Sequence, residues 1–155
     1  MQIFLAGIMQ GSHLGTAMHN QDYRRRLVDL LQTYLPMAEI YDPLAGHGNS
    51  LDYDDATARR VFLEHIQMCR QMDVLLAFVP EASMGTAIEM WQAHQCGHTV
   101  VTISPLKHNW SVRFLSDLLY GDLVEFEEAL TNGQLASRIA QIQASKCTRP
   151  ESASP

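Results

Sequence analysis

The chain has 155 residues, 46% of them hydrophobic, and a formal net charge of −6 at pH 7. A chain of this length forms one domain with a buried core. Its acidic balance argues against a sequence-independent nucleic-acid binder, and no apolar stretch approaches the roughly 20 residues that span a bilayer. The basic triplet Arg24-Arg25-Arg26 lies in a helical pattern and is expected on a solvated helix face.

The N-terminus and the cysteines indicate a cytoplasmic protein. Met1–Gly7 lacks the basic region of a signal peptide and is typical of a first strand. Cys69, Cys96 and Cys147 are an odd number of cysteines without metal-ligand spacing, as expected in a reducing compartment. We expect a cytoplasmic location and neither a metal nor an organic cofactor.

Strand and helix patterns alternate along the chain. Apolar runs typical of strands lie, in chain order, at 3–6, 39–41, 73–79, 99–103 and 123–126. Helical spacing is found between and after these runs, at 20–35, 55–71, 86–96, 110–120 and 127–144, the last interrupted at Asn132-Gly133. The polar segment 146–155 is expected to be a disordered tail.

This alternation predicts an α/β protein: one doubly wound, flavodoxin-like domain over residues 1–145, with a five-stranded parallel sheet flanked by helices. In such a sheet the strand order reverses between strands one and three, and ligands bind above that point. The glycine-rich loop 7–15 and the turn at 82–89 are therefore expected to meet in one crevice.

The turn that follows the third strand holds the most informative residues. The apolar run Val74–Val79 ends at Pro80, and a helical pattern then carries one acid, Glu89. Ser83 could bind an anion together with the backbone N–H groups of Met84 and Gly85, because helix N-termini favour negative charge. The alternative is an ordinary strand-to-helix turn in which Ser83 caps the helix and Glu89 is solvated.

The loop after the first strand offers backbone access and polar groups. Gly7 permits close backbone approach, and Gln10, Ser12 and His13 offer donors beside Gly11. The spacing is neither a dinucleotide fingerprint nor a phosphate-binding P-loop, which argues against nicotinamide cofactors and ATP. A flexible loop without a binding role is the alternative.

Three segments together resemble the nucleoside 2-deoxyribosyltransferase family, including its nucleotide N-glycosidase branch. They are Phe4–Gly11, Cys69–Pro80 and Ser83–Ala93, and only the Ser-x-Gly-x-x-x-Glu element of the third is sharp. The resemblance covers about 120 residues, with the strand at 99–103 at the expected distance. It implies that Glu89 attacks the anomeric carbon, forms a glycosyl-enzyme intermediate and expels the base.

The resemblance also implies the substrate class and the assembly. Nucleotide hydrolases of the family have a serine at the position of Ser83, where it binds the 5′-phosphate, whereas the deoxynucleoside transferases have an aspartate. A nucleoside 5′-monophosphate is therefore favoured over a free nucleoside. In many members a serine from a neighbouring subunit completes the phosphate site. Ser116 is the matching candidate, which implies a homodimer or larger assembly with shared active sites.

Two positions depart from the family pattern. Phe4 stands where many members have a tyrosine that orients the nucleophile, and some ribonucleotide-directed members resemble the chain here, which makes ribose plausible. His65 stands where an acid usually contacts the sugar or assists the leaving base, with Glu64 beside it. We favour Glu64 for this role because a carboxylate suits both hydroxyl binding and general acid catalysis; His65 in this role, or both side chains in solvent, are the alternatives.

The sequence therefore predicts an enzyme that cleaves the base–sugar bond of a nucleotide, or that transfers the sugar between bases. The alternatives are a phosphoribohydrolase or NAD-cleaving enzyme with a similar glutamate, and a nucleotide-binding module without activity. Neither a nucleic-acid polymer nor a membrane is an expected partner. The base, the sugar and the choice between hydrolysis and transfer are not encoded in any recognised motif.

Overall fold

The computed structural model describes residues 1–9 and 18–148, which form alternating strands and helices. The strands are β1 (Gln2–Gly7), β2 (Glu39–Tyr41), β3 (Val74–Phe78), β4 (Thr99–Ile103) and β5 (Leu118–Tyr120). The helices are α1 (Asp22–Tyr34), the 3₁₀ turn η1 (Ser50–Asp52), α2 (Asp55–Met68), α3 (Met84–Gln95), α4 (Trp110–Leu115), α5 (Leu123–Thr131) and α6 (Gln134–Cys147).

The strands form one parallel sheet in the order β2-β1-β3-β4-β5, which confirms the predicted flavodoxin-like arrangement. Strands β1 and β3 are neighbours in register from Ile3 opposite Val74 to Gly7 opposite Phe78. The chain order therefore reverses between them, and the segments that follow the two strands leave the sheet at the same edge.

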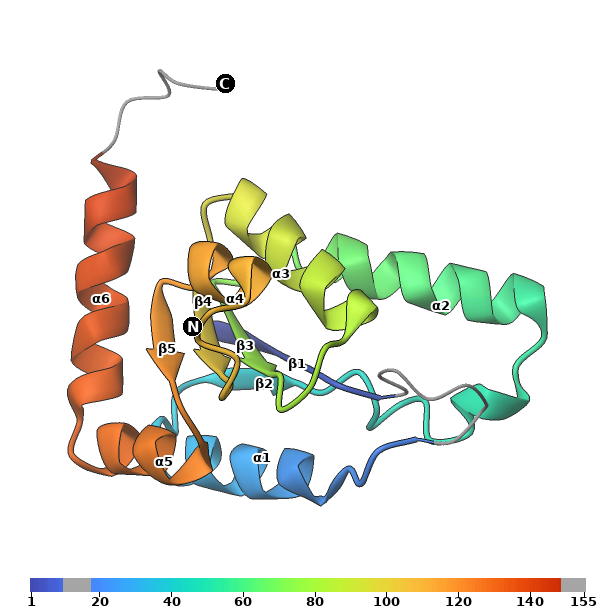
Figure 1. Cartoon of the computed structure of the whole chain (residues 1–155), viewed down its shortest axis with the longest axis horizontal. Helices are drawn as coiled ribbons and strands as arrows, with labels where there is room; N and C mark the ends of the chain where they lie inside the picture. The colour runs from blue at the N-terminus through green and yellow to red at the C-terminus, as the bar shows by residue number, and fades with distance from the viewer. Residues whose placement is uncertain (10–17, 149–155) are drawn as a thin grey trace.

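Each face of the sheet has its own core, because successive side chains of a strand point to opposite sides. Helices α2, α3 and α4 cover one face and α1 and α5 the other, while α6 runs past the β5 edge (Figure 1). In β1, Phe4 and Ala6 point towards the face of α2 and α3, whereas Ile3 and Leu5 point towards α1. These residues are almost fully buried, so β1 is apolar on both sides, as expected of a central parallel strand.

The second half of the chain differs from the prediction. The fifth strand is Leu118–Tyr120, within the predicted helix 110–120, and the predicted strand 123–126 is the start of α5. Asp122 is the reason, because its carboxylate accepts hydrogen bonds from the backbone N–H groups of Val124 and Glu125 and so caps a helix there. The expected interruption at Asn132-Gly133 separates α5 from α6.

The first two residues of the predicted tail belong to a helix. Lys146 and Cys147 form the last turn of α6, and the Lys146 ammonium donates to the backbone carbonyl of His98 and to Asp117. The remainder of the predicted tail, from 149 onward, lies outside the described residues. Within the described ranges, none of the helices combines the length and the apolarity needed to cross a membrane.

Candidate functional site

Glu89 lies in the second turn of α3, on the side of the helix that packs towards β1, β3 and α2. Its carboxyl group is largely withdrawn from water, and this burial raises its pKa to about 7, while the charge of Arg24 lowers it. The side chain is therefore not the solvated acid of the alternative reading. Near neutral pH it exists in both the protonated and the ionised form.

Arg24 is buried, which contradicts the expected position of the basic triplet on a solvated face. Its guanidinium donates to the backbone carbonyls of Leu5 (3.0 Å) and Gly7 (3.1 Å), to the Gln21 side chain (2.8 Å) and to the Asp42 carboxylate (2.7 Å). Arg25 and Arg26 are exposed as predicted. The hydrogen bonds of Arg24 thus join the end of β1 to α1 and to the segment after β2.

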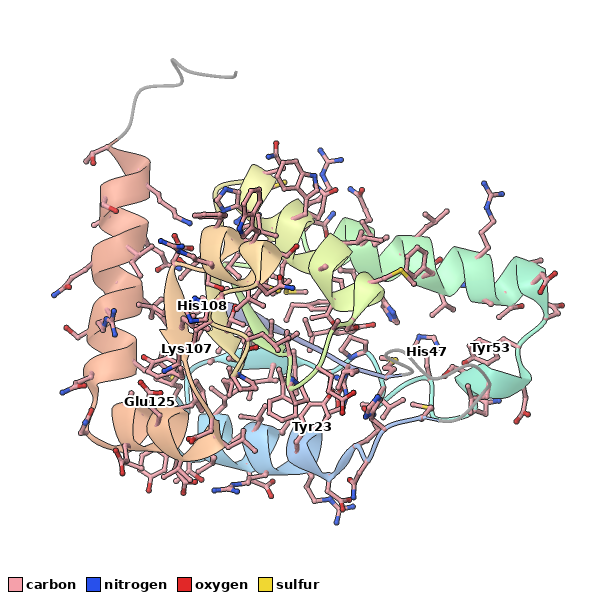
Figure 2. All side chains as sticks on the ribbon, in the orientation of Figure 1. Tyr23, His47, Tyr53, Lys107, His108 and Glu125 are labelled. Atoms are coloured by element: carbon pink, nitrogen blue, oxygen red, sulfur yellow. The ribbon has the colours of Figure 1, made fainter. Side chains whose placement is uncertain are left out.

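Gly7 has a structural role that differs from the expected ligand approach. A Cβ atom at position 7 would collide with the ring and hydroxyl of Tyr23. The Tyr23 hydroxyl donates to the carbonyl of Ile8 (3.1 Å), and its ring lies 4.3 Å from that of Phe78. The pKa of Tyr23 is raised to about 12, mainly by burial and in small part by the charge of Glu89, so this phenol lies near the carboxylate. Figure 2 shows it between α1 and the sheet.

Ser83 caps α3, as one of the two readings of the sequence predicted. Its hydroxyl lies 2.9 Å from that of Thr86 and weakly accepts from the Thr86 backbone N–H at 3.4 Å. A cavity of about 170 Å³ opens beside it. The cavity is lined by residues of the α3 start and of the loop into α4, among them Ser83, Met84, Asn109 and Ser111.

The start of α3 is open to ligands. Met84 is 82% exposed, and a Cβ atom at Gly85 would meet nothing within 4 Å. Free space above this turn is what an anion bound to helix N–H groups requires. The cap and the cavity are compatible with the predicted phosphate site.

An aromatic cluster lies where α2 crosses the ends of β1 and β2. His65 is buried, with its ring centroid 5.1 Å from that of His47, 6.0 Å from Tyr41 and 6.4 Å from Phe4. His47 is fixed by a 2.8 Å hydrogen bond to the Tyr53 hydroxyl, and Figure 2 shows these two side chains together. Burial lowers the pKa of His65, and the charges of His47 and Arg24 lower it further.

Phe4 supports this cluster from below. It is fully buried, and its ring centroid lies 5.5 Å from that of Tyr41 in a stacked arrangement. Tyr41 of β2 supplies a phenol beside His65, and Tyr23 of α1 supplies one near Glu89.

Helix α2 turns His65, and not Glu64, towards the sheet. Val61, His65 and Cys69 are buried at a spacing of four residues, which places them on one helix face. Glu64 is exposed and pairs with Arg60 at 3.2 Å. The charge of Glu89 raises the pKa of the Cys69 thiol, so the inner face of α2 faces the same place as the carboxylate.

Ser116 is held within its own subunit. Its hydroxyl lies 2.6 Å from that of Thr102 and 2.5 Å from the carbonyl oxygen of Val112. The exposed serine on this segment is Ser111, which lines the cavity beside Ser83. The predicted loop residues Gln10, Gly11, Ser12 and His13 lie outside the described residues.

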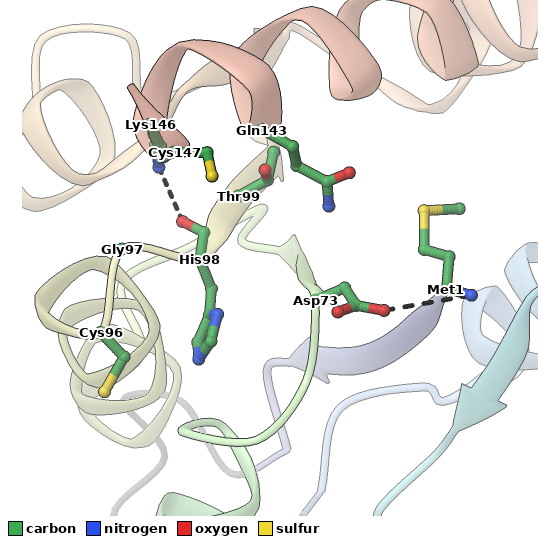
Figure 3. A pocket seen from close by; sticks show the side chains of 9 residues that line it. All are labelled: Met1, Asp73, Cys96, Gly97, His98, Thr99, Gln143, Lys146 and Cys147. Carbon is green, nitrogen blue, oxygen red and sulfur yellow. Dashed lines mark hydrogen bonds and ion pairs between the residues drawn. The ribbon is translucent and has the colours of Figure 1, made fainter. Parts of the chain in front are cut away.

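A second cavity lies at the opposite edge of the sheet. It has a volume of about 640 Å³ and is lined by the starts of β3 and β4 and the ends of α3 and α6, including Asp73, His98, Thr99 and Lys146 (Figure 3). The Lys146 ammonium bonds to the His98 carbonyl there. Over the residues that the structure describes, no three His, Cys, Asp or Glu side chains gather closely enough to hold a metal ion.

Comparisons with solved structures show the fold of the chain. The 2-deoxyribosyltransferase of Bacillus psychrosaccharolyticus superimposes with a TM-score of 0.62 at 16% identity, over 82% of this chain and 90% of the enzyme. The CMP N-glycosidase BcmB of Clostridium botulinum gives 0.50 at 19% identity, over 85% and 99%. A conserved protein from Enterococcus faecalis V583 gives 0.51 at 17% identity, over 90% and 97%.

The chain therefore has the fold of a 2-deoxyribosyltransferase and of a nucleotide N-glycosidase, which confirms the predicted resemblance at the level of the fold. No protein-family model and no curated protein matches the sequence.

Proposed function

We propose that the protein is an N-glycosidase that cleaves the base–sugar bond of a nucleoside 5′-monophosphate, with base transfer as the variant reaction. The observation that carries the proposal is the position of Glu89: a partly buried carboxyl group on α3, six residues after the cap Ser83, at the point where the strand order reverses. The shared fold with a deoxyribosyltransferase and a CMP N-glycosidase supports it.

Glu89 acts as the nucleophile in this proposal. Its ionised carboxylate attacks C1′, the C1′–N bond breaks through an oxocarbenium-like state, and the bonding electron pair leaves with the base. Water, or a second base, then attacks C1′ and releases Glu89. This is the double displacement of retaining glycosidases.

The phosphate lies over the start of α3. Ser83 and the N–H groups that follow it supply hydrogen bonds, and the positive end of the 12-residue helix favours the anion. Ser111 supplies the second hydroxyl in place of Ser116, because Ser111 lines the same cavity and Ser116 is bonded within its own subunit.

His65 takes the role for which the sequence favoured Glu64. It is the polar side chain on the inner face of α2, whereas Glu64 is paired with Arg60 in solvent. An imidazole beside the sugar or the leaving base can donate a hydrogen bond when neutral and a proton when charged.

Release of free base from nucleoside monophosphates tests the proposal. Purified protein is incubated with each ribo- and deoxyribonucleoside monophosphate, and base and sugar phosphate are separated by chromatography. We expect release from at least one of them, and a loss of several orders of magnitude in rate in the Glu89→Gln variant. Equal release by Glu89→Gln protein would refute the nucleophile, and a nucleotide that binds but stays intact would favour a binding module.

A further inference from the structure

Arg24 is a buried cation that the proposed reaction does not yet use. A guanidinium is costly to bury unless its N–H groups are bonded and its charge is balanced. Its four hydrogen bonds end on three different segments: the last residues of β1, the residue before α1, and Asp42 in the segment after β2. Such a residue determines how these segments stand relative to one another.

The segments that Arg24 joins include the end of β1, and α3, the helix that carries Glu89, packs against β1. Gly7, whose carbonyl Arg24 binds, pairs with Phe78 at the end of β3, and α3 packs against both β1 and β3. Arg24 interacts favourably with the ionised form of Glu89. Tyr23 and Cys69 also interact with Glu89, but burial raises the pKa of both groups, so that both are neutral near pH 7.

Asp42 opposes the effect of Arg24 on Glu89. Its carboxylate lies 2.7 Å from the guanidinium and also accepts from the backbone N–H of Leu44 at 3.0 Å. Two carboxylates therefore share the field of one cation, and the one in direct contact neutralises part of the charge that the other experiences.

We propose that Arg24 is a positioning residue of the site: it clamps the ends of β1 and β2, against which the helix of Glu89 packs, and it shifts Glu89 towards the ionised form that attacks, with Asp42 moderating its charge. The clamp is given by the four hydrogen bonds of Arg24. Attack by Glu89 rests on the proposed function, so the electrostatic effect and the catalytic effect need separate measurements.

The first measurement follows the Glu89 carboxyl itself and needs no activity. Its titration is observed by ¹³C NMR of glutamate-labelled protein, with the Glu89→Gln variant identifying the signal. Arg24→Gln should raise the midpoint by about one pH unit, because a nearby cation lowers a carboxyl pKa by about that much or more. Asp42→Asn should lower it, because the asparagine oxygen can still accept both hydrogen bonds but no longer neutralises Arg24.

Arg25→Gln is the matched control. It removes the same charge from the neighbouring position of the same helix, but Arg25 is exposed, so the midpoint should not move. If Arg24→Gln does not fold, Asp42→Asn decides alone. An unchanged midpoint in Asp42→Asn, or an equal shift in Arg25→Gln, would overturn the electrostatic role.

The second measurement is the pH profile of base release. The rising limb should move to higher pH in Arg24→Gln and to lower pH in Asp42→Asn, with kcat at pH 7 changing more than KM. Midpoint shifts in a protein that releases no base from any nucleotide would leave the role of Arg24 intact and refute the proposed function. If the protein releases base but neither substitution shifts the pH profile, the role of Arg24 is refuted and the proposed function stands.

Discussion

Tyr23 and Gly7 fit against each other so closely that position 7 cannot carry a side chain without moving the tyrosine. The contact joins α1 to Gly7, the last residue of β1. The Tyr23 hydroxyl adds a hydrogen bond to the next residue, Ile8. Packing against Tyr23 therefore requires a glycine at position 7, in addition to any backbone approach by a ligand.

Gly7→Ala should destabilise the protein by about 1–3 kcal/mol, because the added methyl group overpacks the contact with Tyr23. The free energy of unfolding in urea measures this loss. Gly85→Ala is the matched control: its Cβ meets open space at the start of α3, so the change should be neutral or slightly stabilising. Adding Tyr23→Phe to Gly7→Ala should cost less than the sum of the single losses, and strict additivity would contradict the contact.

The burial of Glu89 predicts a pH dependence of stability. Its folded-state pKa of about 7 lies above the ordinary glutamate value of 4.5, so the native protein binds more protons than the unfolded chain between these values. The free energy of unfolding should therefore fall as pH rises through this window, by up to about 3 kcal/mol, and Glu89→Gln should lack that loss. Urea unfolding at pH 5 and pH 8 measures the difference between the two proteins, in which the contributions of other groups cancel. A constant difference would contradict the shifted pKa.

Much of this architecture follows from local sequence, and the failures have identifiable causes. The run Val74–Val79 and the turn before Glu89 place the central strand and the site. Leu118–Tyr120 was missed because it continues the apolar pattern of α4, although Asp122 marks a helix start just after it. Hydrophobic patterning alone does not separate a short strand from the end of a helix.

The misplacement of Arg24 has a different origin. Arg24, Leu27 and Leu31 are spaced as one helix face, and all three are buried. The spacing was therefore visible in the sequence, but a basic triplet is usually solvated. Which of its members turns inward depends on carbonyls and a carboxylate from β1 and the segment after β2, and such tertiary partners are not encoded locally. The choice between Glu64 and His65 depended in the same way on tertiary packing. A shift of one residue along α2 decides which of the two side chains faces the sheet.

Ser83 variants separate helix capping from phosphate binding. Ser83→Ala should raise KM for the nucleotide by about tenfold to a hundredfold and leave the nucleoside almost unaffected, because a charge-assisted hydrogen bond contributes about 1.5–3 kcal/mol. Ser83→Asp keeps a good cap but places a negative charge at the phosphate, so it should abolish use of the nucleotide without loss of stability. A variant that impairs nucleotide and nucleoside equally would show that Ser83 is only a cap.

Adjacent residues on α2 provide a matched pair for the proposed role of His65. His65→Asn keeps a hydrogen-bonding side chain but cannot exchange a proton near neutral pH, and we expect kcat for base release to fall by about 10²-fold or more. Glu64→Gln removes only an exposed pair with Arg60, so activity and stability should change little. Steady-state kinetics of both variants measure the difference. A large loss of kcat in Glu64→Gln with little change in His65→Asn would assign the role to Glu64, as the sequence predicted.

The last prediction concerns the outer surface of α3 and α4. Large apolar side chains are exposed along it: Met84, Ile88 and Trp91 on α3, and Trp110 and Phe114 on α4. Met84, Ile88 and Trp91 follow the spacing of one helix face, and Trp110 and Phe114 lie one turn apart, their ring centroids separated by 6.0 Å. Exposed apolar side chains on two helices that pack against each other are typical of a protein interface, and the expected homodimer would bury them around a two-fold axis.

Trp110→Glu should therefore convert the protein into a monomer, because it places a charge in the centre of this surface, and sedimentation velocity measures the change. Val124→Glu is the control, since Val124 is 59% exposed on α5, on the other side of the sheet. If the active site is shared between subunits, activity of the Trp110→Glu protein should rise steeply with protein concentration as dimers re-form. A wild-type monomer that is fully active at the same concentration would rule out both the interface and the shared site.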